Sequence, residues 1–182
     1  RGIRSINHEL IGSSEGDGRH KPPTKHEDKW LVSGSIGSRL WNKSAIGTQI
    51  NEGTLLTPEE VLFCHWHRHI PLPENWVESR LKEDPDFAHK AVAFDVVRNA
   101  GEKVVPRDGR WLRWSRESHP SKEGAEAVIR WARTKENLDM GELLNWTHEL
   151  SKEGMLAELA IVDDEMDVTM YRLSLIEPKG TI

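Results

Sequence analysis

The sequence contains a single cysteine, Cys64, and a single tyrosine, Tyr171, among its 182 residues. One cysteine cannot form an internal disulfide framework, which excludes the small secreted folds that disulfides stabilise. No apolar run approaches the roughly 18 residues needed to cross a bilayer, and the first residues lack the basic-then-apolar pattern of a signal peptide. We therefore expect a soluble, cytoplasmic protein that does not enter a membrane.

Acidic residues outnumber basic ones, because the sequence has 25 Lys and Arg residues and 30 Asp and Glu residues. The net charge is therefore -5. The field of the whole molecule repels polyanions, so any contact with nucleic acid must use a local basic patch or a more basic partner. The length suits one large domain or two small ones, and a domain near this size buries about two-thirds of its unfolded surface.

In the first half, residues 1–29 are polar and rich in glycine and proline, which predicts a loop or mobile arm. Short strands are expected at 30–32 and 38–41. Thr57 and Glu60 then form a capping box around Pro58, which predicts the start of a helix. The charged stretch 82–90, with Asp84 as a cap before Pro85, predicts a domain boundary.

In the second half, apolar residues at helical spacing follow Phe87, and Gly101 is placed to end that helix. Strands are expected at 103–105, 110–114, 125–132, 155–162 and 168–176, with one further helix capped by Asp139 and ended by Gly154. This order predicts an α/β fold of mixed α+β type with a mixed sheet. The expected division is a helix-and-sheet domain at 1–82 and a second domain at 83–182.

Three histidines two residues apart, His65, His67 and His69, stand beside Cys64 near the end of the predicted helix. His65 and His69 have the i, i+4 spacing of zinc ligands. The glutamate of a metalloprotease motif is missing, however, and no second ligand cluster is evident. The favoured interpretation is therefore histidines at a fraying helix end, with no metal and no cofactor.

Arginines alternate with tryptophans between residues 107 and 116. Such a surface can pair with phosphates and stack on bases, so Arg107, Arg110, Arg113 and Arg116 are candidate RNA contacts. A strand with buried tryptophans and solvated arginines explains the same pattern equally well.

Four carboxylates, Asp163, Asp164, Glu165 and Asp167, fall within five positions between two predicted strands. A calcium loop of the EF-hand type needs ligands spread over about twelve residues and a glycine at the bend, and neither is present. The acids are therefore either solvated at a hairpin tip or held for a positively charged partner.

The order and spacing of several segments resemble the archaeal tRNA-splicing endonuclease family. The segments are "SRLWNKSAIGT" with "GTLLTPEEVLF", "FAHKAVAFDVVRNAGEKVV" and "LAELAIVDDEMDVTMYRL". Catalytic subunits of that family use a tyrosine, a histidine and a lysine for metal-independent cleavage, in which the ribose 2′-hydroxyl attacks the adjacent phosphate and leaves a cyclic phosphate. In this sequence the three positions fall at Trp114, Gly124 and Met155, so the triad is lost.

The resemblance therefore implies a structural, non-catalytic subunit of a heterotetrameric enzyme, a dimer of heterodimers with a catalytic subunit that acts on precursor tRNA. It implies that the acidic turn docks into a basic groove of an opposing subunit and that the last strand forms a subunit interface. The interface residues would be Val168, Met170, Tyr171, Leu173 and Leu175.

Two alternatives remain open. A homodimeric endonuclease could use a displaced triad containing His119 and Lys152. A stand-alone RNA-binding module could work through the arginines between residues 107 and 116, and it would bind RNA tightly and with strong salt dependence without a partner.

Overall fold

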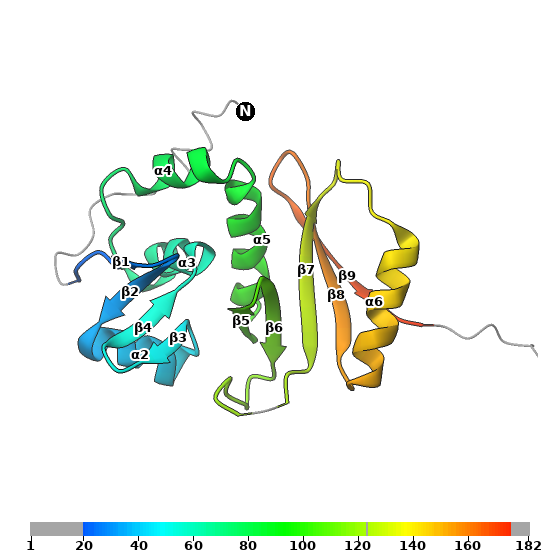
Figure 1. The fold of residues 1–182 in the computed structure, drawn as a ribbon, viewed down its shortest axis with the longest axis horizontal. Helices are drawn as coiled ribbons and strands as arrows, with labels where there is room; N and C mark the ends of the chain where they lie inside the picture. The colour runs from blue at the N-terminus through cyan, green and yellow to red at the C-terminus, as the bar shows by residue number, and fades with distance from the viewer. Residues whose placement is uncertain (1–19, 123, 176–182) are drawn as a thin grey trace, which may run out of the picture.

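The computed structural model describes residues 20–122 and 124–175, which form helices and two sheets (Figure 1). In chain order the elements are β1 Thr24–His26, β2 Lys29–Ser33, α2 Gly34–Ser44, β3 Thr48–Ile50, β4 Gly53–Leu56, α3 Pro58–Arg68, α4 Trp76–Glu83, α5 Phe87–Asn99, β5 Lys103–Arg107, β6 Arg110–Trp114, β7 Ala127–Arg133, α6 Met140–Lys152, β8 Leu156–Val162 and β9 Val168–Leu173. The predicted mixture of helices and sheets, an α+β fold, is confirmed.

The first sheet is antiparallel with the strand order β1-β2-β4-β3. The strand expected at 38–41 is wrong, because these residues belong to α2. Gly37, Leu40 and Trp41 are its buried residues and have the i, i+3, i+4 spacing of one helix face. Glycine lets this face approach the sheet closely, since a Cβ on Gly37 would lie 2.0 Å from the carbonyl oxygen of Val32.

The predicted loop at 1–29 also needs correction, because it contains β1 and the first residue of β2. Residues 1–19 of this segment lie outside the described residues. Helix α4 was not predicted at all. It ends at Glu83, where the domain boundary was expected, and Asp86 rather than Asp84 is the N-cap residue of α5. The Asp84 carboxylate instead accepts a hydrogen bond from the Asp86 amide at 3.1 Å.

The predicted capping box at the start of α3 is confirmed. Glu60 accepts a hydrogen bond from the Thr57 amide at 3.1 Å through one carboxylate oxygen. Its second oxygen accepts a hydrogen bond from the Gly47 amide at 2.6 Å. Glu60 is only 1% exposed, and this burial raises the pKa of its carboxyl to about 7. One buried carboxyl thus caps α3 and attaches it to the turn before β3.

We expect the free energy of unfolding to fall between about pH 4.5 and pH 7 because of Glu60. Its pKa is higher in the folded state than its ordinary value of 4.5, so in this window the folded protein holds a proton that the unfolded chain releases. The loss amounts to about 3 kcal/mol and levels off above the folded pKa. Urea unfolding at a series of pH values measures it.

The matched control is Glu60→Gln, which removes the titration. The Thr57 and Gly47 amides donate to different oxygens of Glu60, and the substitution replaces one of these oxygens with an NH2 group that cannot accept a hydrogen bond. This variant should therefore be less stable at every pH. The difference in pH slope between wild type and variant isolates the contribution of Glu60. An identical pH slope in both proteins contradicts the prediction.

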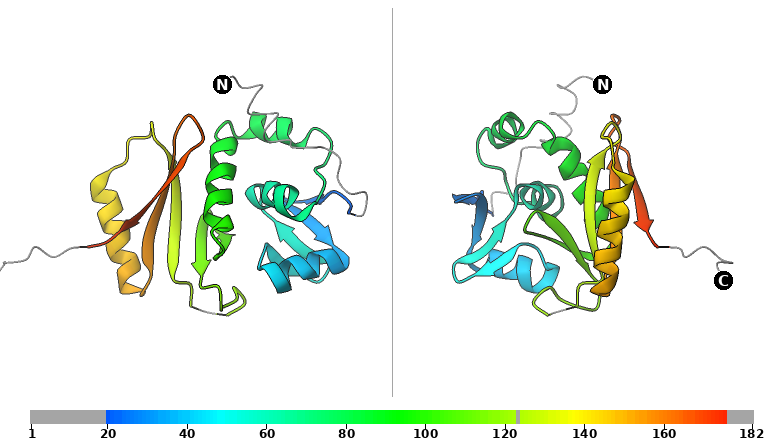
Figure 2. Two further views of the ribbon diagram at one scale, coloured as in Figure 1. Left: turned by 180° about the vertical axis from the view of Figure 1, so that it is seen from behind. Right: turned by 45° about the vertical axis from the view of Figure 1, so that its right-hand side comes forward.

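The second sheet has the strand order β5-β6-β7-β8-β9, and it is antiparallel except for the pair β7 and β8. That parallel pair requires a crossover, which α6 provides. Helix α5 covers one face of the sheet and α6 covers the other, as the views from both sides show (Figures 1 and 2). The predicted mixed sheet is confirmed.

The main hydrophobic core contains residues from both halves of the chain. It includes Leu56 and Leu62 from the first half and Phe94, Ile129 and Val162 from the second. Helices α3 and α5 pack between the sheets, and the Phe63 and Phe94 rings meet edge to face at 5.9 Å. The stretch at 82–90 therefore separates two sheets that share one core. A smaller cluster around Val128 and Leu150 lies under α6.

Candidate functional site

The acidic turn connects β8 to β9 and is braced by its own backbone. One Asp163 carboxylate oxygen accepts hydrogen bonds from the Glu165 and Asp167 amides, both at 2.9 Å. The Asp163 amide in turn donates to the Asp167 carbonyl at 3.0 Å. Asp163 therefore shapes the turn, and its bonded carboxylate oxygen is not free for a partner.

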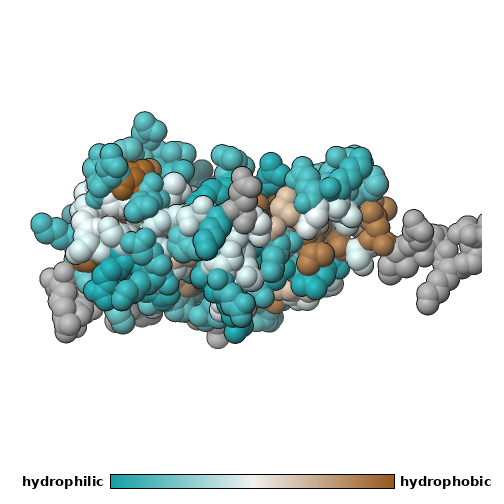
Figure 3. Space-filling view, turned by 90° about the horizontal axis from the view of Figure 1, so that it is seen from below, coloured by the Kyte–Doolittle hydropathy of each residue, from teal (hydrophilic) through white to brown (hydrophobic). Residues whose placement is uncertain are grey.

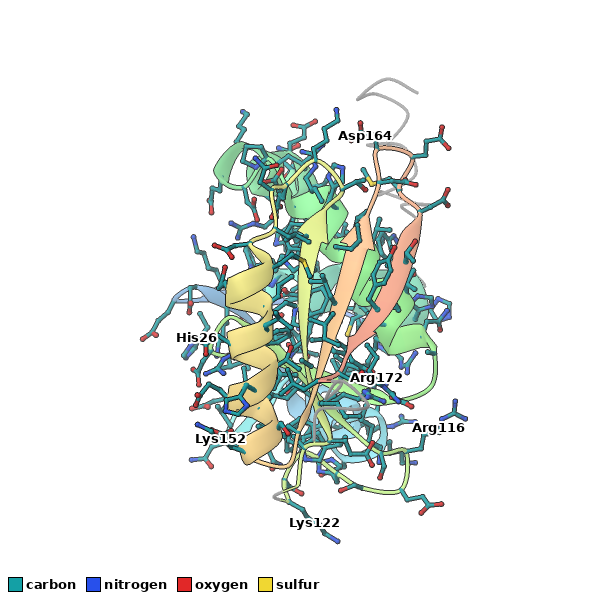
Figure 4. All side chains as sticks on the ribbon, turned by 90° about the vertical axis from the view of Figure 1, so that its right-hand side faces the viewer. His26, Arg116, Lys122, Lys152, Asp164 and Arg172 are labelled. Atoms are coloured by element: carbon teal, nitrogen blue, oxygen red, sulfur yellow. The ribbon has the colours of Figure 1, made fainter. Side chains whose placement is uncertain are left out.

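Asp164 is also engaged within the chain. Its carboxylate contacts the Lys135 ammonium at 2.8 Å and the Arg133 guanidinium at 3.3 Å, both near the end of β7. The hydrogen bond from Lys135, followed by the one from Arg133, lowers the pKa of Asp164. Figure 4 shows Asp164 at one end of the second sheet, with Lys122 at the other end.

Glu165 and Asp167 are exposed, as Asp164 is, but neither of them forms an ion pair with any described residue. The prediction treated the four carboxylates as one group. The structure divides them, because Asp163 and Asp164 have partners within the chain. Of these four acids, Glu165 and Asp167 are the two whose exposed charge has no ion-pair partner in the described part of the chain.

The predicted interface strand corresponds to β9, although the strand ends at Leu173 and Leu175 lies beyond it. Within the described residues β9 pairs with β8 alone, so its other edge is open. Met170, Tyr171 and Leu175 are 41%, 51% and 45% exposed. Val168 and Leu173 are half-buried against the core clusters of their own chain. Ile176, the last residue of the expected strand, lies outside the described residues. Apolar surface gathers at this end of the molecule, coloured brown on the right of Figure 3.

Two of the four candidate RNA-binding arginines are buried or half-buried and have structural partners. Arg113 is 7% exposed and pairs with Glu102 and, at 3.0 Å, with Glu158. Arg107 donates to the Gly47 carbonyl at 3.2 Å, and burial lowers the pKa of its guanidinium. Arg113 is thus neutralised by carboxylates, whereas Arg107 bonds to neutral carbonyl oxygens. RNA contact at these two residues stays a prediction.

The other two arginines, Arg110 and Arg116, are exposed. Arg116 uses one guanidinium nitrogen to donate to the Ala100 carbonyl at 2.8 Å. The tryptophans between the arginines are buried: Trp111 is 3% exposed and Trp114 is 6% exposed. The two tryptophans of this segment are therefore buried, as the second interpretation of the pattern expected.

The three positions implied by the family resemblance come together at one end of the second sheet. Trp114 ends β6, Gly124 precedes β7, and Met155 precedes β8. The adjoining strands are hydrogen-bonded there, because Glu126 donates to the Arg113 carbonyl and Leu156 donates to the Glu126 carbonyl. At this end of the sheet the Trp114 indole nitrogen donates a hydrogen bond to the Lys122 carbonyl at 3.1 Å.

His119 and Lys152, the residues of the displaced-triad alternative, have other partners. The ring nitrogens of His119 contact the Trp41 carbonyl oxygen at 2.9 Å and the Ser121 hydroxyl at 2.8 Å. The Lys152 ammonium is exposed and pairs with Glu149 at 3.3 Å, one turn earlier on α6. Each side chain thus has a local structural explanation.

The histidines near the end of α3 do not form a metal site. His67 bonds to Asp95 of α5 at 2.5 Å, a ring nitrogen of His65 contacts the Ile70 carbonyl at 2.9 Å, and His69 is the left-handed C-cap residue. Burial raises the pKa of the Cys64 thiol. Among the described residues, no group of three or more His, Cys, Asp or Glu side chains could hold a metal ion.

No protein-family model matches the chain, and no curated protein matches it significantly. Within residues 20–122 and 124–175, no helix is both long and apolar enough to cross a membrane.

Sequence reasoning missed a buried network of charges on the α5 side of the second sheet. Glu158 of β8 lies between Arg113 of β6 and Arg172 of β9, at 3.0 Å and 3.1 Å, and Arg113 also contacts Glu102. The alternation of β6 places Arg113 on the same face as the buried Trp111, which was the one available signal. Its acidic partners are distant in sequence.

Proposed function

We propose that this chain is a non-catalytic subunit of a heterotetrameric RNA-splicing endonuclease resembling the archaeal tRNA-splicing enzymes. In this role it positions catalytic subunits on an intron-containing precursor tRNA. The proposal extends to the partner, a catalytic subunit with an intact tyrosine, histidine and lysine.

The convergence of Trp114, Gly124 and Met155 is the observation that carries the proposal. Three positions taken from the family resemblance lie at or just before the ends of three neighbouring strands, an arrangement that suits a composite RNA-cleaving site. None of the three has a side chain that can transfer a proton or stabilise phosphate charge. The arrangement therefore suits a subunit that keeps the framework of such a site without its chemistry.

The acidic turn and β9 support the same assignment. Glu165 and Asp167 are exposed without ion-pair partners in the described part of the chain, and β9 offers an open edge with exposed Met170 and Tyr171. An open strand edge with apolar side chains promotes aggregation unless another chain covers it. Both features suit assembly with a second subunit that has a basic groove.

The test compares the purified chain alone with the chain co-expressed with a catalytic subunit, using an intron-containing precursor tRNA. We expect no cleavage by the chain alone. With the partner we expect an assembled complex that leaves 2′,3′-cyclic phosphate ends. Cleavage by the chain alone would overturn the proposal, and so would a failure of the two chains to associate.

A control separates this proposal from the displaced-triad alternative. In the assembled enzyme, His119→Ala together with Lys152→Ala should leave the rate constant of cleavage within about twofold of wild type, since their side chains bond to Trp41, Ser121 and Glu149. Loss of the chemical step, with assembly unchanged, would favour the displaced triad.

A further inference from the structure

A pocket of about 220 Å³ beside α2 is surrounded by basic side chains. His20, Arg39, Lys43 and Arg68 line it, together with the apolar side chains of Ile36 and Leu40. Arg39 and Lys43 are exposed at its edge. Within the described part of the chain, no aspartate or glutamate lines the pocket.

The larger pocket where the two halves meet has a different charge balance. It measures about 460 Å³, and its basic residues are accompanied by Asp28, Glu59 and Asp108. The Glu59 carboxylate, for example, pairs with the Lys90 ammonium at 3.2 Å. The pocket beside α2 is therefore a local excess of positive charge on a chain whose net charge is -5.

A further cation, Arg98, lies behind the basic pocket. Arg98 is 8% exposed and donates to the Ser44 and Glu102 carbonyl oxygens, the latter at 2.8 Å. Burial, and after it the charge of Arg68, lowers the pKa of Arg98. Both guanidinium groups contact the Phe63 ring, at 5.7 and 5.8 Å from its centre. The two cations thus repel each other, and no described carboxylate forms an ion pair with either.

Helix ends explain only part of this cluster. Lys43 and Arg68 lie in the last turns of α2 and α3, where cations interact favourably with the helix dipole. Arg39 lies in the middle of α2, and His20 precedes β1. An anion in the pocket would reduce the repulsion between Arg68 and Arg98.

We propose that the basic pocket binds a backbone phosphate of an RNA chain. Pockets that enclose drug-sized ligands measure roughly 300–1,000 Å³, so this one suits a phosphate group better than a whole nucleotide. Arginine guanidinium groups pair with phosphate oxygens through parallel hydrogen bonds, and Lys43 adds a point charge. The phosphate chemistry rests on the pocket alone, whereas the choice of RNA as its source rests on the proposed function.

The test uses the isolated chain, so it does not depend on a catalytic partner. The variant Arg39→Gln with Lys43→Gln removes two pocket cations. The matched control, Lys25→Gln with Lys82→Gln, removes two exposed cations of β1 and α4 that lie outside this pocket. Both variants change the net charge equally, and the altered side chains are exposed, so circular dichroism should show unchanged folding.

Two probes are used, inorganic phosphate by isothermal titration calorimetry and a precursor tRNA transcript by fluorescence anisotropy at several salt concentrations. We expect the pocket variant to lose phosphate binding and to bind the RNA about tenfold more weakly, with the control within about twofold of wild type. The slope of log affinity against log salt should become shallower by about 1 for each phosphate-contacting cation removed.

The outcomes separate the pocket from the subunit assignment. Equal RNA affinities for the pocket and control variants would overturn the RNA-phosphate site but leave the subunit proposal intact. Loss of phosphate binding without a change in RNA affinity would also overturn it, because the pocket would then serve a free phosphate or a small phosphorylated ligand. If the pocket variant loses both activities and the chain never associates with a catalytic subunit, only the splicing assignment fails.

Discussion

Replacing Glu158 with alanine is expected to lower the free energy of unfolding by about 3–5 kcal/mol, the usual cost of breaking a buried ion pair by removing one partner. Glu158 is 8% exposed and lies between the guanidinium groups of Arg113 and Arg172. The Arg113 side chain is only 9% exposed, so without Glu158 its charge would be left with Glu102 alone. Urea unfolding of both proteins at the same pH measures the difference.

Arg172→Gln is the matched control for this prediction. It removes a partner of the same carboxylate, but the Arg172 side chain is 58% exposed, so water can replace it. We expect the control to cost less than about 1 kcal/mol, as exposed ion pairs do. A loss below 1 kcal/mol for Glu158→Ala as well would mean that Arg113 is adequately paired by Glu102, and the prediction would be wrong.

Local signals predicted much of the second sheet. Cap residues placed α3 and α6, alternation and β-branched residues placed the strands, and Gly101 and Gly154 lie just past the ends of α5 and α6. Helix α2 was mistaken for a strand because four residues of mixed character do not distinguish a period of 2 from one of 3.6. Its helical face becomes apparent only when the close packing of Gly37 on β2 is known.

The candidate sites were predicted less completely, because their partners come from distant parts of the chain. Nothing adjacent to Arg113 in sequence indicates that Glu158 will neutralise it, 45 residues away. Asp164 likewise meets Arg133 and Lys135 only because β7 and β8 are parallel and end side by side. The basic pocket was missed for the same reason, since its lining residues come from two helices and the segment before β1.

The division of the acidic turn leads to the second large prediction. Glu165→Gln together with Asp167→Asn is expected to weaken association with the proposed catalytic subunit by roughly 100-fold or more. Close charge pairs across an interface contribute upwards of ~1.5 kcal/mol each, and each 1.4 kcal/mol is about tenfold in affinity. The stability of the isolated chain should change by less than about 0.5 kcal/mol, because both side chains are exposed and form no ion pair with another described residue.

Asp164→Asn provides the comparison that separates charge from position. It lies in the same turn, but its carboxylate is already paired with Lys135 and Arg133, so a partner gains less from it. We expect this variant to weaken association by less than the Glu165 and Asp167 pair.

Sedimentation analysis of the mixed subunits at rising sodium chloride concentration gives the affinities. If docking into a basic groove drives assembly, the affinity of the wild-type chain falls more steeply with rising salt concentration than that of the Glu165 and Asp167 variant. The reason is that salt screens the charges of Glu165 and Asp167, which the variant lacks. Parallel salt dependences would place the contact elsewhere, and the exposed apolar residues of β9 would then be the surface that holds the subunits together.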